Sequence, residues 1–197
     1  MYTPTSIARR SNPFLGPCWT RKQIIRERHF ETVEPLYLTS ASMPEDHETA
    51  YQYALAKKMD WVLQIEDDVL PPLDVIDRFL EYPQHSVMCG RLRMRFDPRI
   101  WTPYRCTGWD FKLQGFAKSR QLMPGELTRR TLRVEGIGQP IMYKPQALAK
   151  ARIHFRGPNS QWDHMFSRDL YLANVPVICV TAVKSKHYDI EKRRVLS

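Results

Sequence analysis

The stretch Trp61-Val62-Leu63-Gln64-Ile65-Glu66-Asp67-Asp68 decides which fold we expect for this chain of 197 residues. Its first five residues are almost continuously apolar, and a run of this length predicts a strand covered on both faces, as in a parallel sheet. Three acidic residues follow the run directly. We therefore expect a central strand whose carboxyl end carries a cluster of carboxylates.

The segments on either side of this strand alternate between helical and strand patterns. Strands are predicted at 35–39, 61–65, 86–92, 140–143 and 175–183, and helices at 42–58, 71–80, 145–152 and 161–174. The first helix is expected to begin with a capping box formed by Ser42 and Glu45. Such alternation predicts an α/β fold with one domain over residues 1–197. Segment 96–133 shows no clear period and predicts long loops or irregular hairpins, and a charged tail begins at Lys184.

Composition narrows the class of protein. The chain is 43% hydrophobic and 26% charged, which is ordinary for a globular domain and excludes a disordered chain, a collagen and a disulfide miniprotein. No apolar run approaches the roughly 18 residues of a membrane span, and the N-terminus lacks the apolar region of a secretory signal. We expect a cytoplasmic protein, in the host cytoplasm if it is viral.

Charge and cysteine usage add two expectations. The net charge of +9 indicates an anionic partner, which is nucleic acid, an anionic membrane surface or a phosphorylated small molecule. The four cysteines, at 18, 89, 106 and 179, have no metal-binding spacing and are expected as buried, reduced thiols. A disulfide is the alternative if the organism is hyperthermophilic.

The acidic cluster is the part of the sequence that says most about chemistry. Strand alternation points Glu66 and Asp68 to the same side and Asp67 to the other. Two converging carboxylates repel each other, so that one is protonated or a cation lies between them. Carboxylate oxygens suit Mg²⁺ or Mn²⁺, which also bind diphosphate oxygens, and open α/β sheets bind ligands at the carboxyl ends of their strands. Capping of the following helix is the alternative interpretation.

Residues 61–76, WVLQIEDDVLPPLDVI, resemble the core of GT-A-fold glycosyltransferases of the family-2-like kind, in which a strand ends in an Asp-x-Asp motif. Residues 51–56 are similar to the helix before that strand, and Glu66 replaces the first Asp. The resemblance implies a GT-A-like (Rossmann-like) mixed, mostly parallel sheet flanked by helices in a single domain. It also implies a nucleotide-sugar donor and a divalent cation, Mn²⁺ or Mg²⁺. Length and motif order further resemble viral members of this class, of the kind carried by an icosahedral virus of hot-spring archaea.

The resemblance assigns roles to the residues at the predicted donor site. The nucleotide and the donor would contact Pro4, Thr5, Thr39, Glu66 and Asp67. The metal would be held by Glu66, Asp68 and His187, since the family often ends its core with a metal-binding histidine. A mixed shell of oxygen and imidazole ligands favours Mn²⁺. Lys184, Lys186 or an arginine at position 9 or 10 would add positive charge at the phosphates.

Two further segments resemble the acceptor half of the family. Residues 136–148, GIGQPIMYKPQAL, are similar to its acceptor-side strand and turn, and Trp162-Asp163-His164-Met165-Phe166 is similar to its acidic helix start. Asp163 is the predicted general base, which implies inversion at the anomeric carbon; an acidic residue that only stabilises the helix N-terminus is the alternative. His187 has a comparable alternative, an isolated surface histidine.

These observations predict a metal-dependent glycosyltransferase that moves a sugar from a nucleotide-diphosphate sugar to an acceptor hydroxyl of a glycan or glycoprotein. The aromatic-rich segment 96–133 either forms the acceptor side or packs as a satellite cluster. A basic nucleic-acid-binding protein and a metal-dependent phosphodiesterase are the alternatives, and basic clusters at 91–95, 129–133 and 192–194 would serve the first. The arginines of 91–95 alternate, which predicts a half-buried strand with arginine on its wet face. No specific nucleic acid is expected as a partner, whereas peripheral contact with an anionic membrane is compatible with the charge.

Overall fold

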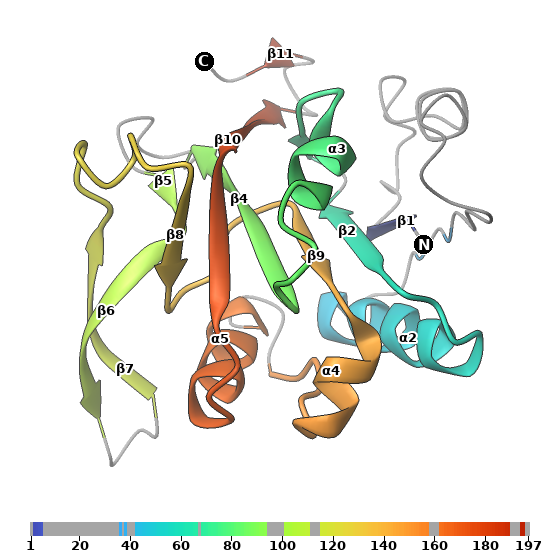
Figure 1. The fold of residues 1–197 in the computed structure, drawn as a ribbon. Helices are drawn as coiled ribbons and strands as arrows, with labels where there is room; N and C mark the ends of the chain where they lie inside the picture. Colours follow the sequence, from blue (N-terminus) through green and yellow to red (C-terminus); the bar gives the residue numbers. More distant parts are fainter. Residues whose placement is uncertain are drawn as a thin grey trace.

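A computed structural model describes residues 2–5, 36, 38, 42–66, 68–93, 101–110, 115–157, 162–189 and 194–195. One mixed sheet dominates it (Figure 1). The strands of its main path are, in spatial order, β1 (Tyr2–Thr5), β2 (Val62–Glu66), β9 (Ile141–Tyr143), β4 (Val87–Arg93), β10 (Val177–Asp189) and β11 (Arg194–Val195). Three strands pair off this path: β3 (Val69–Leu70) and β8 (Thr131–Val134) with β10, and β5 (Trp101–Thr102) with β4.

Strand direction places the carboxyl ends of the central strands at one edge of the sheet. β1 is parallel to β2 and β4 is parallel to β10, whereas β9 runs antiparallel to both β2 and β4. It follows that β1, β2, β4 and β10 share one direction, and β2, β4 and β10 end toward the top of Figure 1. The predicted mixed α/β sheet with flanking helices is confirmed, with β9 as the antiparallel strand between parallel ones.

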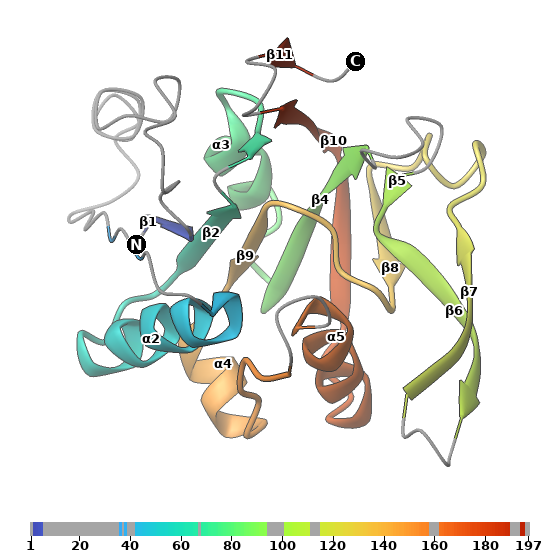
Figure 2. The same ribbon diagram turned by 180° about the vertical axis from the view of Figure 1, so that it is seen from behind.

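Helices cover both faces of the sheet, which explains why β2 is apolar throughout. One core cluster contains Val62 of β2 together with side chains of α2 (Met43–Ala56), α4 (Pro145–Lys150) and α5 (Trp162–Leu172). The other contains Leu63 and Ile65 of β2 and side chains of α3 (Val75–Leu80). Successive residues of β2 therefore enter opposite cores. In Figures 1 and 2, α2, α4 and α5 lie around the lower half of the sheet and α3 lies beside its upper edge.

The predicted helices are all present, although their ends differ. α2 begins at Met43 with Ser42 as its N-cap, but the Ser42 side chain makes no capping hydrogen bond, so the predicted capping box does not form. A proline in its first turn replaces part of that role, because proline lacks the N–H that a cap would satisfy. The predicted strand 35–39 falls largely outside the described residues, and so does Thr39. No helix of the described ranges is long and apolar enough to cross a membrane.

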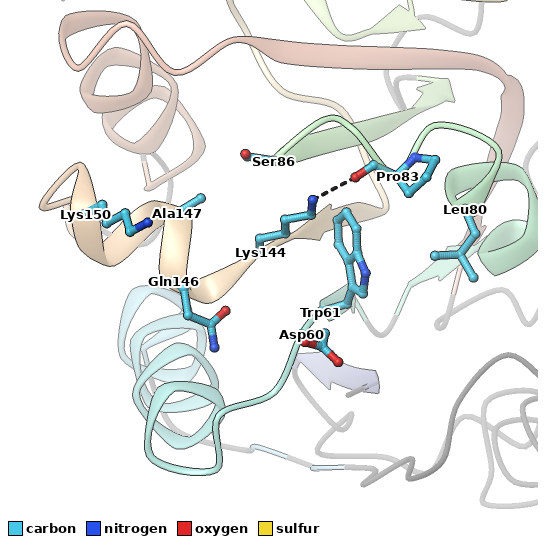
Figure 3. A pocket seen from close by; sticks show the side chains of 9 residues that line it. All are labelled: Asp60, Trp61, Leu80, Pro83, Ser86, Lys144, Gln146, Ala147 and Lys150. Atoms are coloured by element: carbon cyan, nitrogen blue, oxygen red, sulfur yellow. Dashed lines mark hydrogen bonds between the residues drawn. The ribbon is translucent and has the colours of Figure 1, made fainter.

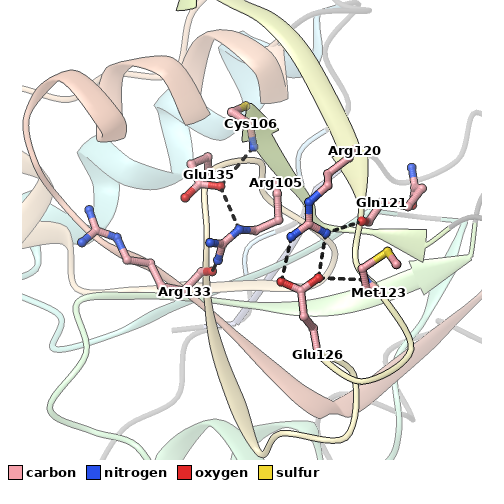
Figure 4. Close-up of polar contacts among 8 residues, drawn as sticks. All are labelled: Arg105, Cys106, Arg120, Gln121, Met123, Glu126, Arg133 and Glu135. Atoms are coloured by element: carbon pink, nitrogen blue, oxygen red, sulfur yellow. Dashed lines mark hydrogen bonds and ion pairs between the residues drawn. The ribbon is translucent and has the colours of Figure 1, made fainter. Parts of the chain in front are cut away.

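The segment predicted as long loops or irregular hairpins contains such a hairpin, because the register between its two strands shifts between Cys106 and Gly108 and again between Gly108 and Trp109. It contains β5, a hairpin of β6 (Tyr104–Asp110) and β7 (Gly115–Gln121), and β8. Ion pairs hold it in place (Figure 4): Arg120 binds Glu126 through two hydrogen bonds of 2.7 and 3.0 Å, and Arg105 lies 3.5 Å from Glu135.

β10 continues beyond the predicted end of its strand. The tail that was expected to be charged from Lys184 onward is strand as far as Asp189. Lys184 and Lys186 are exposed and alternate with buried Ser185 and His187, which is the period-two pattern of a half-buried strand. The predicted end of the strand at residue 183 was wrong, because a strand whose exposed positions are lysines lacks the apolar pattern by which strands are recognised.

Candidate functional site

The carboxyl end of β2 is where the predicted donor-site residues lie. β1 runs parallel to β2, with Pro4 in register with Ile65 and Thr5 in register with Glu66. The end of the first strand therefore lies beside the first acidic residue, as the donor-site prediction requires. Asp67 and Thr39 are outside the described residues, so their predicted roles remain predictions.

A second pairing brings the predicted metal residues to the same corner. After Glu66 the chain turns through Asp68 into β3, and β3 pairs antiparallel with β10. In that ladder Val69 is in register with His187, which sets His187 one residue from Asp68 along the neighbouring strand. Two segments far apart in the sequence thus bring the backbone of His187 next to the strand that follows the acidic turn.

The hydrogen bond of His187 determines which of its nitrogens can act as a ligand. The side chain is buried, with 9% of its surface exposed, and Nδ1 lies 2.5 Å from the backbone oxygen of Arg93. A carbonyl oxygen only accepts hydrogen bonds, so Nδ1 carries the proton and Nε2 carries the lone pair. Histidines that bind metals commonly show this arrangement, with one nitrogen donating to a carbonyl and the other facing the metal.

These donors are of the kinds that fit a divalent metal, although no closed shell is formed by the described residues. Carboxylate oxygen and imidazole nitrogen together suit Mn²⁺. Within the described ranges, no three His, Cys, Asp or Glu side chains are close enough together to hold a metal ion. A shell at this corner would have to draw on Asp67 or on oxygens of the bound substrate.

Gln139 is a residue of this corner that the sequence analysis missed. Its Nε2 donates a hydrogen bond of 3.3 Å to Oε1 of Glu66. The side chain is 7% exposed, and its Oε1 is buried without a hydrogen-bond partner. Gln139 belongs to the segment 136–148, which resembles the acceptor side of the family. Nothing else in the sequence indicates that this residue contacts Glu66. Gln139 connects that segment to the acidic end of β2.

The backbone of this segment passes unusually close to β4. A Cβ atom on Gly138 would lie 2.2 Å from the backbone oxygen of Gly90, and one on Gly136 would lie 2.3 Å from the ring of Tyr104. Only glycine permits such an approach. The close contact positions Gln139 toward Glu66, while Ile137 donates its N–H to Oγ of Ser167 on α5 at 3.1 Å.

Asp163 lies in the first turn of α5, on the other side of this segment. Its Oδ1 accepts a hydrogen bond of 2.9 Å from the backbone N–H of His164. Tyr104 is its neighbour: burial raises the pKa of the Tyr104 hydroxyl, and the negative charge of Asp163 raises it further. The hydroxyl of Tyr104 is buried without a hydrogen-bond partner.

A cavity of about 750 Å³ lies at the opposite edge of the sheet (Figure 3). Asp60 and Trp61 precede β2 and Ser86 precedes β4, so the cavity opens at the amino ends of these strands. Lys144 Nζ donates to the backbone oxygen of Pro83 at 2.7 Å and lies over the ring of Trp61. Ligands of open α/β sheets bind at the carboxyl ends, so we place the candidate site there and not in this cavity.

Comparisons with known proteins bear on the fold. No protein-family model and no curated protein sequence matches the chain. Among solved structures, A197 from STIV aligns with 99% of this chain over 91% of its own, at 16% identity and a TM-score of 0.61. GalNAc-T7, solved with UDP, GalNAc and Mn²⁺, aligns with 94% of this chain at 8% identity and a TM-score of 0.53. The chain spans 37% of that protein.

At these identities the likeness concerns the fold. The chain has a GT-A-like fold, and the predicted resemblance to GT-A structures is confirmed at that level. What the protein does with this fold is a separate question, because one fold hosts many chemistries.

Proposed function

We propose that the protein is a metal-dependent glycosyltransferase that moves a sugar from a nucleotide-diphosphate sugar to an acceptor hydroxyl. The observation that carries the proposal is the β3–β10 pairing, in which His187 is in register with Val69, the residue after Asp68. The GT-A-like fold supports it, as does the structural likeness to GalNAc-T7, which was solved with UDP, GalNAc and Mn²⁺.

In this proposal the donor binds at the carboxyl end of β2. Pro4, Thr5 and Thr39 line the nucleotide pocket with Asp67. Glu66, Asp68 and His187 would hold Mn²⁺ or Mg²⁺ together with Asp67 or with oxygens of the bound substrate, because the described side chains do not complete a metal site by themselves. When bound, the metal supplies a Lewis acid that neutralises the charge of the leaving diphosphate. Gln139 orients the Glu66 carboxylate through its hydrogen bond. The proton on His187 Nδ1, donated to Arg93, keeps the lone pair on Nε2.

The acceptor binds on the side of α5, where Asp163 acts as the general base. Asp163 removes the proton of the acceptor hydroxyl. A base of this kind implies inversion at the anomeric carbon. The strands β5 to β8 form the wall of the acceptor site, and the acceptor hydroxyl belongs to a glycan or glycoprotein.

A thermal-shift screen tests the donor half of the proposal. The wild type is heated with UDP, GDP and their common sugar conjugates, each in Mn²⁺ and in EDTA. Ligands that bind the folded state raise the midpoint by mass action. We expect a Mn²⁺-dependent rise with one nucleotide, which disappears in Asp68→Asn and in His187→Gln.

Two variants outside the site serve as matched controls. Asp74→Asn removes a carboxylate that pairs with Arg78 on α3, and His85→Gln removes a histidine from the turn before β4. Both should keep the nucleotide shift of the wild type. A screen without any Mn²⁺-dependent shift, or a shift that survives both Asp68→Asn and His187→Gln, would contradict the proposal.

A further inference from the structure

Two arginines of β4 differ from the other arginines that are packed into the molecule. The arginines of α3, of the hairpin and of α5 are matched with carboxylates: Arg78 with Asp74, Arg105 with Glu135, Arg120 with Glu126 and Arg168 with Asp169. Arg91 and Arg93 make no ion pair with any described residue, and no described oxygen accepts a hydrogen bond from their guanidinium groups. Their contacts are with the ring of Trp101, which lies 4.8 Å from the Arg91 guanidinium and 4.9 Å from that of Arg93.

The position of these side chains is held by the surrounding strands. Arg93 is in register with Trp101 in the β4–β5 pair, and the Trp101 N–H donates to Oε1 of Gln121 at 3.2 Å. Arg91 is in register with exposed Lys184 in the β4–β10 pair. Two guanidinium groups therefore lie against one aromatic ring near the carboxyl end of β4, and the paired strand β10 carries a third basic residue in register with Arg91.

Arg91 is the residue of this group whose charge is buried. The alternating arginines predict a solvent-exposed strand face for Arg91, but only 5% of its surface is exposed, and its Nε is buried without a hydrogen-bond partner. Burial lowers the pKa of its guanidinium. A buried charge is unfavourable unless it is paired, and a contact with an aromatic ring satisfies none of the N–H groups of the guanidinium. The described residues supply no anion that would repay this cost.

We propose that Arg91, Arg93 and Lys184 form a binding site for an oxyanion of the phosphate type, and that this group is carried by the acceptor. The second half of this statement rests on the proposed function, whereas the first does not. Planar guanidinium groups with several N–H donors suit phosphate oxygens, which bind them through paired hydrogen bonds.

The face of the sheet assigns the group to the acceptor and not to the donor diphosphate. Along β4, Val87 and Cys89 enter the core cluster that contains side chains of α5, while Met88 and Leu92 enter the other cluster. By strand alternation Arg91 and Arg93 lie on the α5 side, the side of Asp163. His187 follows Val183 with a period of two, and Val183 belongs to the opposite cluster. The predicted metal ligand and the two arginines thus lie on different faces.

Titration with inorganic phosphate in EDTA tests the site without any nucleotide or metal. Binding is followed by ³¹P NMR and calorimetry in the wild type, Arg91→Met, Arg93→Gln and the control Arg133→Gln, which removes an exposed arginine of β8. We expect each of the first two substitutions to weaken binding by about tenfold or more, as for hydrogen bonds to charged groups. Arg133→Gln and Asp68→Asn should leave the affinity unchanged.

The thermal midpoint of Arg91→Met distinguishes a lost binding site from a folding defect. Replacing an unpaired buried charge with an apolar side chain of similar length should keep or raise the thermal midpoint in the absence of phosphate. We therefore expect a variant that is at least as stable as the wild type but no longer binds phosphate. A lower midpoint together with unchanged phosphate affinity would show that Arg91 has a purely structural role and would overturn the proposal.

The remaining outcomes separate this proposal from its competitors. Absence of phosphate binding overturns it, and so does an equal loss in Arg133→Gln, which would mean that phosphate responds only to net charge. Displacement of phosphate by the nucleotide in Mn²⁺ would assign the arginines to the donor and overturn the acceptor assignment. A short single-stranded oligonucleotide is the last competitor. If it displaces phosphate, and if its own binding is weakened as much by Arg133→Gln as by Arg91→Met, the basic residues form a nucleic-acid surface instead. If nucleotide binding fails but phosphate binding depends on Arg91 and Arg93, the proposed function falls and the oxyanion site stands.

Discussion

Gln64 is a polar residue inside the most apolar strand of the chain, and its partners explain its presence there. Its Oε1 lies 2.8 Å from Nδ1 of His47, and its Nε2 donates to the hydroxyl of Tyr143 at 2.9 Å. All three side chains are fully buried. A buried amide is tolerated when its groups are hydrogen-bonded, so the chain His47–Gln64–Tyr143 links α2, β2 and β9.

His47 makes the stability of the protein depend on pH in a predictable direction. Burial lowers its pKa from 6.5 to about 3, and the hydrogen bond with Gln64 only partly opposes this effect. Between these two pH values the unfolded chain binds a proton that the folded chain does not, so acidification favours unfolding. We expect the free energy of unfolding in urea to fall below pH 6.5 by up to about 1.4 kcal/mol per pH unit from this residue.

The contribution of His47 is separated from that of other titrating groups by comparing, between variants, the slope of the free energy of unfolding against pH. His47→Gln should lose stability less steeply between pH 7 and pH 5 than the wild type, whatever its absolute stability. His85→Gln should retain the slope of the wild type. Equal slopes in the wild type and in His47→Gln would mean that His47 does not titrate as its burial implies.

Asp163 yields a second prediction at the scale of a single residue. If it is the base, Asp163→Asn removes proton transfer but no donor contact. We expect transfer, followed as release of the nucleoside diphosphate from the donor that the screen identifies, to fall by about 10² or more. The nucleotide-induced thermal shift should remain, and His164→Gln should transfer normally. Full activity of Asp163→Asn would leave Asp163 as an acid that only stabilises the helix N-terminus.

At the scale of elements, strands and helices with a clear period were predictable and those with polar or distant partners were not. β2 was predicted because both its faces enter apolar cores. The extension of β10 from Lys184 was missed because its exposed positions are lysines, although the alternation with buried residues was present in the sequence. The pairing of β3 with β10 left no local trace, since a two-residue strand has too few positions to show a period.

The segment 136–140 is the element whose geometry is most sharply constrained. On Gly138, a Cβ would lie 2.2 Å from the backbone oxygen of Gly90 and 2.9 Å from the backbone nitrogen of Pro103. Backbone atoms cannot move aside cheaply, so we expect Gly138→Ala to lower the free energy of unfolding by about 1–3 kcal/mol. Gly125→Ala is the matched control, because a Cβ there meets nothing within 4 Å. Equal stability of the two variants in urea would show that the segment is not held against β4.

In the molecule as a whole, several contacts connect the described part of segment 96–133 to the main sheet. β8 pairs with β10, Tyr104 of β6 bridges Gly136, and Cys106 N–H donates to Glu135 at 3.0 Å. We therefore expect thermal unfolding in one cooperative step, with coincident midpoints by far-ultraviolet circular dichroism and by tryptophan fluorescence, which reports Trp101 and Trp162 among others. An earlier fluorescence transition would indicate that the excursion unfolds by itself.

The amino-acid sequence was enough to predict the fold class and a cluster of acidic residues at the end of β2. Local patterns suffice for this prediction. A strand that is buried on both faces has a continuous apolar sequence, and acidic residues that follow it require a cation or a role in capping a helix. The long-range contacts became visible only in the folded chain. The β3–β10 ladder pairs His187 with Val69, Gln139 reaches Glu66 from a loop whose glycines pack against β4, and on the other face of the sheet Arg91 is buried beside Trp101. Contacts between segments far apart in sequence depend on how the elements pack, and packing leaves no period in the sequence to be found.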